Sequence, residues 1–129
     1  MYCLDSSIFI PLLRGDKGIK KMLDSVEPES ISITTITLCE LFRGAFKSRD
    51  IKNDLATVHG LIRDYKTLAF DVESSQVFGE DFVNLEKSGK QTQVLDLMIA
   101  SITKSNNMIL VTRNKKHFEN IPDLKVEEW

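Results

Sequence analysis

The sequence predicts a three-layer α/β/α fold around a central, mainly parallel sheet of about five strands. Three observations support this prediction. Short apolar runs typical of strands alternate with stretches whose apolar residues recur at helical spacing. Strands separated by helices are joined by right-handed crossovers, which give a parallel sheet covered on both faces. No internal repeat, low-complexity tract or flexible linker interrupts the 129 residues, so we expect one domain over residues 1–129.

The first half of the chain contains two of the predicted strands. In order, the predicted elements are a strand at 1–4, helices at about 8–14 and 17–26, a strand at about 30–34, and helices at about 38–47 and 50–65. Pro11 is compatible with the first helix only if it lies in the first turn. The last of these helices has Ile51, Leu55, Val58 and Ile62 on one face.

The second half is predicted to add three strands and two helices. The strands are expected at about 67–70, 108–111 and 124–129, the last at the sheet edge. Asp71 is a suitable N-cap for a helix that runs to about residue 88, where Gly89 stops it. The next helix is predicted from an apolar stripe at i, i+3, i+4 and i+7, formed by Leu95, Met98, Ile99 and Ile102.

Composition and charge exclude several classes of protein. Apolar content is 42% and charged content 28%, ordinary for a globular domain, and no apolar run is long enough to span a membrane. The N-terminus enters a strand without the pattern of a signal peptide, and Cys3 and Cys39 are interpreted as reduced core thiols of a cytoplasmic protein. A net charge of −2 argues against a protein that coats nucleic acid, but an acidic catalytic cluster would lower the charge of a nuclease. No dinucleotide-binding or P-loop glycine motif is present.

Four polar residues occur in matching places along the chain. Asp5 and Asn114 follow strand-like runs, while Glu40 and Asp96 lie near the starts of helices. In a parallel α/β sheet such positions gather at the carboxyl edge. Clustered carboxylates repel one another unless a cation neutralises them, and hard oxygen ligands favour Mg²⁺ or Mn²⁺. The pattern therefore favours a metal-dependent enzyme.

Each of these residues also has a purely structural interpretation. Asp5 could cap the following helix, and Thr37 with Glu40 fits a capping box that would explain the glutamate without any function. Asp96 has large apolar neighbours and no Lys or Arg three or four residues away, so a metal is the favoured partner for its part-buried carboxylate. Asn114 is as well explained as a turn residue or cap as by a role in the site.

Basic residues near these positions are candidates for phosphate contacts. Arg14, Arg43 and Arg113 could meet a phosphate or a transition-state charge, as could Lys90. The alternative for Arg43 is an i,i+3 ion pair with Glu40. For the others it is an exposed charge without function. The two histidines have no zinc-binding spacing.

Taken in register, these motifs resemble those of the PIN-domain ribonucleases, and specifically the VapC-type toxins of prokaryotic toxin–antitoxin pairs. The resemblance covers the whole chain. Its four motifs and its ending are Leu4-Asp5-Ser6-Ser7, Thr37 to Ala45 with an intact Glu-Leu-x-x-Gly, Asp96 to Ser101, Val111-Thr112-Arg113-Asn114 with Phe118, and Ile121 to Trp129. Each motif is weak alone, and the set in order is specific.

The resemblance implies an endoribonuclease that cleaves phosphodiester bonds with Mg²⁺ or Mn²⁺ and so inhibits translation. Asp5, Glu40 and Asp96 would hold the metal, with Asn114 as the fourth polar residue. Ser6 or Thr112 could position water or phosphate. The resemblance also implies a homodimer that is silenced by a cognate antitoxin protein.

One position departs from the family pattern. Where the family often has an acid in Asn-x-x-Asp-Phe, this chain has His117 between Lys116 and Phe118. The fourth corner of the site thus carries less negative charge than in many members. Two alternatives therefore stay open, a catalytically weak or silent PIN-fold module that binds RNA or protein, and a PIN nuclease of RNA maturation.

Overall fold

The computed structural model describes all 129 residues and contains a five-stranded sheet in the order β3-β2-β1-β4-β5. The strands are β1 (Tyr2–Leu4), β2 (Ile31–Thr34), β3 (Lys66–Leu68), β4 (Ile109–Val111) and β5 (Val126–Glu127). Every neighbouring pair is parallel. The predicted α/β class with a parallel sheet of about five strands is confirmed.

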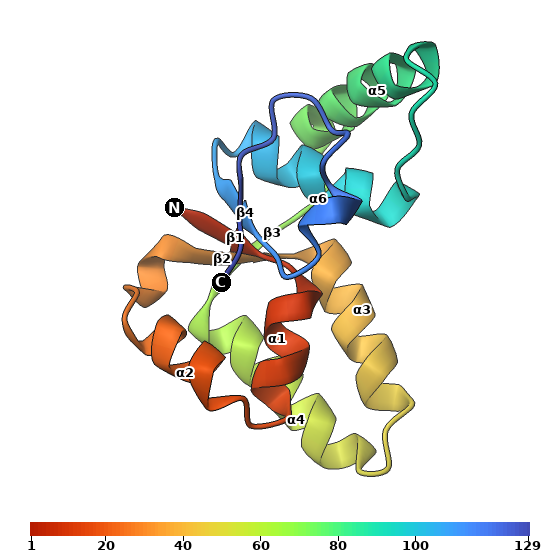
Figure 1. Ribbon diagram of the computed structural model, residues 1–129. Coiled ribbons are helices and arrows are strands. Elements are labelled where there is room, and N and C mark those ends of the chain that lie inside the picture. Colours follow the sequence, from red (N-terminus) through yellow and green to blue (C-terminus); the bar gives the residue numbers. More distant parts are fainter.

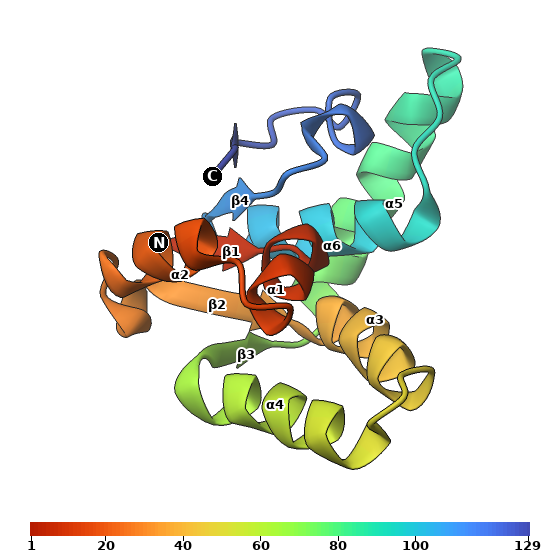
Figure 2. The same ribbon diagram turned by 60° about the horizontal axis from the view of Figure 1, so that its bottom comes forward.

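Helices cover both faces of this sheet. They are α1 (Ser6–Leu13), α2 (Lys17–Asp24), α3 (Thr35–Phe46), α4 (Ile51–Asp64), α5 (Val72–Lys87) and α6 (Val94–Ser105), with 3₁₀ turns η1 (Pro28–Ser30) and η2 (Lys115–His117). Figure 1 shows α1 to α4 below the sheet and α5 and α6 above it, and Figure 2 shows the same layers from another side. None of these helices meets the length and hydropathy required to cross a membrane.

The core is divided between the two faces by the alternation of side chains along each strand. Leu4 packs with Ile33 and Val111 against α1 to α4, whereas Cys3 and Leu110 pack against α6 on the other face. Because these strands have neighbours on both sides and helices above and below, their side chains are fully buried.

The strand register brings distant residues together at one edge of the sheet. Leu4 of β1 pairs with Ile33 of β2 and with Val111 of β4. The residues that follow, Asp5, Thr34 and Thr112, therefore lie side by side at the carboxyl edge. This is where the polar motifs were predicted to gather.

Two helices begin earlier than predicted because their caps lie further back. Asp5 is the N-cap of α1, so Pro11 is the sixth residue of that helix and the prediction that it lies in the first turn is wrong. Thr34 is the N-cap of α3 and its hydroxyl accepts a hydrogen bond from the Thr37 amide at 3.0 Å. The capping-box interpretation of Glu40 is therefore also wrong, because Glu40 lies in the second turn.

The boundaries of α5 follow the prediction, whereas the burial of two predicted core residues does not. Asp71 caps α5 by accepting the Ser74 amide at 2.9 Å, and Gly89 ends that region with φ of +68°. On α6 the buried face contains Leu97, so the predicted stripe is displaced and Leu95 is half-exposed. Cys39 is exposed, which corrects its assignment as a core thiol.

Candidate active site

A cavity of about 620 Å³ lies at the carboxyl edge of the sheet, between α1, the first turn of α6, the middle and end of α3, and η2. Its walls carry carboxylate, amide, hydroxyl, guanidinium and imidazole groups, with few apolar side chains. The residues that line it are Asp5, Ser6, Ile10, Cys39, Glu40, Arg43, Gly44, Lys47, Gln93, Leu95, Asp96, Asn114 and His117. All four polar residues selected from the sequence thus share one cavity.

Asp5 is the most firmly held of the three acids. One carboxylate oxygen accepts the Ser6 amide, and the other accepts the hydroxyls of Thr112 at 2.7 Å and Ser7 at 3.0 Å. The residue is only 5% exposed, so these donors satisfy a carboxylate that has little access to water. Asp5 therefore serves as a helix cap and also presents a fixed carboxylate to the cavity.

Glu40 and Asp96 reach the cavity from α3 and α6. The Glu40 side chain is half-buried, and no cation forms an ion pair with it, so the i,i+3 pair with Arg43 is not formed. The Asp96 carboxylate has a neighbour from η2, since its Oδ2 lies 3.6 Å from His117 Nδ1. His117, the residue that departs from the family pattern, thus lies beside Asp96, one of the three acids.

The three acids influence one another electrostatically. Burial raises the pKa of Asp96 from 3.8 to about 6; the His117 imidazole opposes this shift, and the charges of Asp5 and Glu40 add to it. Burial also raises the pKa of Glu40, with the Ser6 hydroxyl opposing and Asp5 adding to the shift. Burial is the larger cause of both shifts, and a bound cation would oppose it by favouring the ionised carboxylates.

The remaining predicted residues lie at different distances from the cavity. Ser6, Arg43 and Asn114 line it, whereas Arg14 lines a neighbouring hollow between α1, α3 and α4. Thr112 is fully buried behind Asp5, where its hydroxyl accepts the Asn114 amide at 2.9 Å. Arg113 lies outside, bonded at 3.4 Å to Asp16 Oδ2 and to the carbonyl of Trp129.

Sequence reasoning missed three residues that belong to this region. The Ser7 hydroxyl accepts the Arg113 amide at 2.9 Å and so joins the end of β1 to the end of β4. Lys47 and Gln93 line the cavity. Lys47 could have been found, because it lies seven residues after Glu40 and hence on the same helical face. Nothing in the sequence singles out Gln93.

The donor set fits a hard divalent cation, although the side chains do not form a finished metal site. The cavity offers carboxylate oxygens from three different elements, which is the ligand chemistry of Mg²⁺ and Mn²⁺. As arranged, no three acidic, histidine or cysteine side chains converge closely enough to enclose a cation. Asp5 is fixed, so Glu40 and Asp96 are the side chains that would have to move inward.

A family model described as the PIN domain matches residues 2–124 of the chain. Among curated proteins, the tRNA(fMet)-specific endonuclease VapC of Salmonella typhimurium is 35% identical over 128 residues, which cover 99% of this chain and 97% of that protein. The tRNA(fMet)-specific endonuclease VapC of Shigella flexneri is 27% identical over the same coverage.

Solved structures agree with the sequence comparison. The chain is similar to one in the DNA-bound VapBC complex of Salmonella typhimurium, with a TM-score of 0.91, 30% identity and coverage of 99% and 97% of the two chains. It is also similar to one in VapBC2 of Rickettsia felis bound to a promoter DNA fragment, with a TM-score of 0.89, 27% identity and coverage of 99% and 98%. These similarities extend over nearly the full length of each chain.

Proposed function

The chain belongs to the PIN-domain family, and from that premise we propose that it is a VapC-type endoribonuclease, the toxin of a toxin–antitoxin pair. The observation that carries the proposal is the convergence of the Asp5, Glu40 and Asp96 carboxylates on one cavity, where burial and the neighbouring charges raise the pKa of Glu40 and of Asp96. The full-length similarity to VapC ribonucleases and to VapBC complexes supports it. A silent binding module would have no need to maintain this electrostatic repulsion.

In this proposal Asp5, Glu40 and Asp96 hold Mg²⁺ or Mn²⁺, and Asn114 contributes a neutral oxygen or orients water. The bound cation would polarise the scissile phosphate and lower the pKa of an attacking water. Thr112 and Ser7 keep the Asp5 carboxylate in place.

Arg43 lines the same cavity and has no carboxylate partner, so its guanidinium is free to meet the phosphate. Ser6 lies between Asp5 and Glu40 and is placed to orient the substrate or a water.

The same proposal includes the partners. The structural neighbours are VapBC complexes, so an antitoxin is the expected protein partner. A homodimer acting on RNA in the cytoplasm is what the family implies. The Salmonella relative is named for tRNA(fMet), so the initiator methionine tRNA is the first substrate to test on this chain.

The test is a cleavage assay with purified protein freed of any antitoxin. Initiator and elongator methionine tRNAs and total cellular RNA would each be incubated with Mg²⁺, Mn²⁺ or EDTA. We expect discrete fragments with either metal and none with EDTA. Folded protein that neither cuts any RNA nor binds Mn²⁺ would contradict the proposal and leave a non-cutting binding module.

The raised pKa values predict that cation affinity falls in acid. Asp96, with a pKa of about 6, is largely ionised at pH 7.5 and largely protonated at pH 5, so a cation that binds at pH 5 must first displace a proton. The dissociation constant for Mn²⁺ should rise about tenfold between pH 7.5 and pH 5. Glu40, whose pKa is raised as well, adds to the effect.

Electron paramagnetic resonance of free Mn²⁺ would measure this affinity at several pH values. Circular dichroism at each pH provides the control that the protein remains folded. An affinity that stays constant down to pH 5 would show that the coupled acids do not bind the ion.

A further inference from the structure

Gly44 occupies a position in α3 where nothing in the fold requires glycine. Its φ is not positive, and a Cβ added there would meet no atom of another element within 4 Å. Glycine inside a helix weakens the helix relative to alanine, because it loses more backbone freedom on folding. The residue is exposed and lies one turn after Glu40. Neither packing nor backbone geometry explains it.

The space above Gly44 is where two hollows of the surface meet. The acidic cavity and a second hollow of about 440 Å³ share Ile10, Glu40, Gly44 and Lys47. The second hollow continues between α1, α3 and α4, whose ribbons lie next to one another below the sheet in Figure 1. A side chain at position 44 would project into the passage between them.

The walls of this passage carry cations without partners. Arg43 and Lys47 on α3 and Arg14 at the end of α1 form no ion pair with any carboxylate. Besides Glu40, the second hollow contains one acid, Asp54, which belongs to α4. The positive charges of the second hollow therefore lie on the wall formed by α1 and α3, opposite Asp54 on α4. This wall would attract a polyanion.

The spacing suits a nucleic acid strand. Glu40, Gly44 and Lys47 follow one another along one face of α3, and Lys47 lies roughly 10 Å beyond Glu40 at 1.5 Å per residue. That length corresponds to about three stacked nucleotides at ~3.4 Å each. Ile10 and Leu13 expose 38% and 37% of their surface in the second hollow, an apolar area that bases can cover.

We propose that an RNA strand leaves the acidic cluster by crossing α3 over Gly44, with its phosphates bound by Lys47 and Arg14. This inference rests on the proposed function, since it needs RNA at the acidic cavity. It also explains the glycine: because Gly44 has no side chain, the RNA strand can pass close to the backbone of α3.

The test compares RNA binding by variants that do not cut. In an Asp96→Asn background, fluorescence anisotropy would follow a labelled single-stranded RNA of about twelve nucleotides, long enough to fill both hollows. Gly44→Gln should weaken binding at least tenfold. The matched control is Gly79→Gln, because Gly79 lies exposed within α5, has nothing within 4 Å of its added Cβ and lines neither hollow. It should change the affinity less than twofold.

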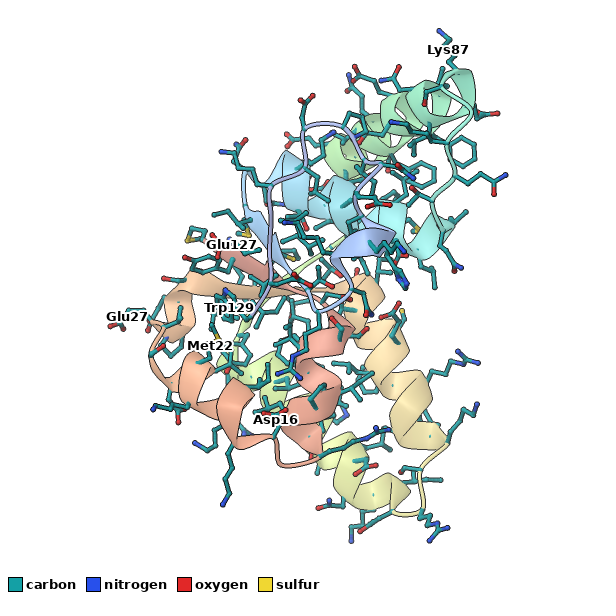
Figure 3. All side chains as sticks on the ribbon, in the orientation of Figure 1. Asp16, Met22, Glu27, Lys87, Glu127 and Trp129 are labelled. Atoms are coloured by element: carbon teal, nitrogen blue, oxygen red, sulfur yellow. The ribbon has the colours of Figure 1, made fainter.

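Salt dependence tests the two cations separately. Lys47→Gln and Arg14→Gln should each reduce the slope of log affinity against log salt by about 0.7, the value for one phosphate contact on a single strand. Lys87→Gln is the control, because Lys87 is exposed at the end of α5 farthest from the sheet (Figure 3). It should leave the slope unchanged.

The outcomes separate this path from the proposed function. Equal RNA affinities for Gly44→Gln and Gly79→Gln, in a protein whose parent cleaves RNA, would overturn the path and leave the function intact. A parent that neither binds nor cleaves RNA would remove both. A labelled poly-glutamate peptide, measured in the same anisotropy assay, serves as a model of an acidic protein. If Gly44→Gln lost affinity for this peptide but not for RNA, the passage would be assigned to an acidic protein partner, and the RNA path would be overturned.

Discussion

Asp96→Asn is expected to abolish RNA cleavage while making the metal-free protein more stable. In the proposed site Asp96 is one of three carboxylates that hold the cation, and an amide cannot replace its charge. Loss of the cation's stabilisation of the transition state should lower cleavage about a thousandfold, which corresponds to ~4 kcal/mol. Cleavage of a defined RNA at saturating Mn²⁺ would measure the loss.

The gain in stability follows from the sign of the pKa shift. Because the folded protein raises the pKa of Asp96 to about 6, its ionised form is disfavoured by folding. At pH 7.5 the charge therefore destabilises the fold, and replacing it with an amide should add about 1 kcal/mol after allowance for solvent screening at this half-buried site. The melting temperature should rise by about 4 °C.

The pH dependence of this gain provides a further check. The difference between the two proteins should shrink as pH falls below 6 and vanish below about 3, where Asp96 is protonated in both the folded and the unfolded chain. Glu86→Gln, an exposed acid on α5, is the control and should change neither activity nor stability. A less stable Asp96→Asn protein at pH 7.5 would contradict the electrostatic account of the cavity.

The sequence predicted the strands and helices from local signals, and the clustered acids from a general rule about parallel sheets. Apolar runs and helical spacing identified the strands and helices. The rule that ligands bind at the carboxyl edge of a parallel sheet predicted that Asp5, Glu40 and Asp96 lie close together, and they line one cavity. Some errors occurred at helix starts, where several residues could serve as caps, and others in the burial of Cys39 and Leu95, which depends on how the helices pack. Thr34 and Thr37 both fit the N-cap of α3, and only the tertiary structure selects Thr34.

Contacts between elements far apart in sequence were beyond local reasoning. The Thr112 hydroxyl bonds to Asp5 across 107 positions, and His117 approaches Asp96 from η2, a turn that no periodicity identifies. The first contact arises because β1 and β4 are neighbours in the sheet, a pairing that strand order alone decides. The position of His117 beside an acid thus became visible only in the fold.

A second distant pair supports the helix that carries Asp96. Lys104 on α6 donates from Nζ to both oxygens of Asp81 on α5, at 2.7 and 3.0 Å. The side chains are 17% and 5% exposed, respectively, so the pair lies between the two helices with little solvent around it. Removal of one partner from a buried pair leaves the other charge desolvated without compensation.

Lys104→Met is therefore expected to lower the free energy of unfolding by about 3 kcal/mol, the lower end of the range for breaking buried pairs. The corresponding fall in melting temperature is about 10 °C. The double variant Lys104→Met with Asp81→Leu replaces both charges of the pair with apolar side chains. It should recover most of the lost free energy of unfolding. Urea unfolding of the three proteins would measure these differences.

The chain offers a matched control for this prediction in Lys20→Met. Lys20 Nζ lies 2.8 Å from Asp24 Oδ2, nearly the same separation as in the buried pair, but its side chain is 67% exposed and that of Asp24 63%. Exposed i,i+4 pairs of this kind contribute little, because water and salt screen the two charges. If burial determines the effect, Lys104→Met lowers the free energy of unfolding strongly and Lys20→Met hardly changes it, although each substitution removes one short ion pair. Equal losses would mean that the Asp81 carboxylate is reached by water in solution, and that α6 is held against α5 by its apolar contacts alone.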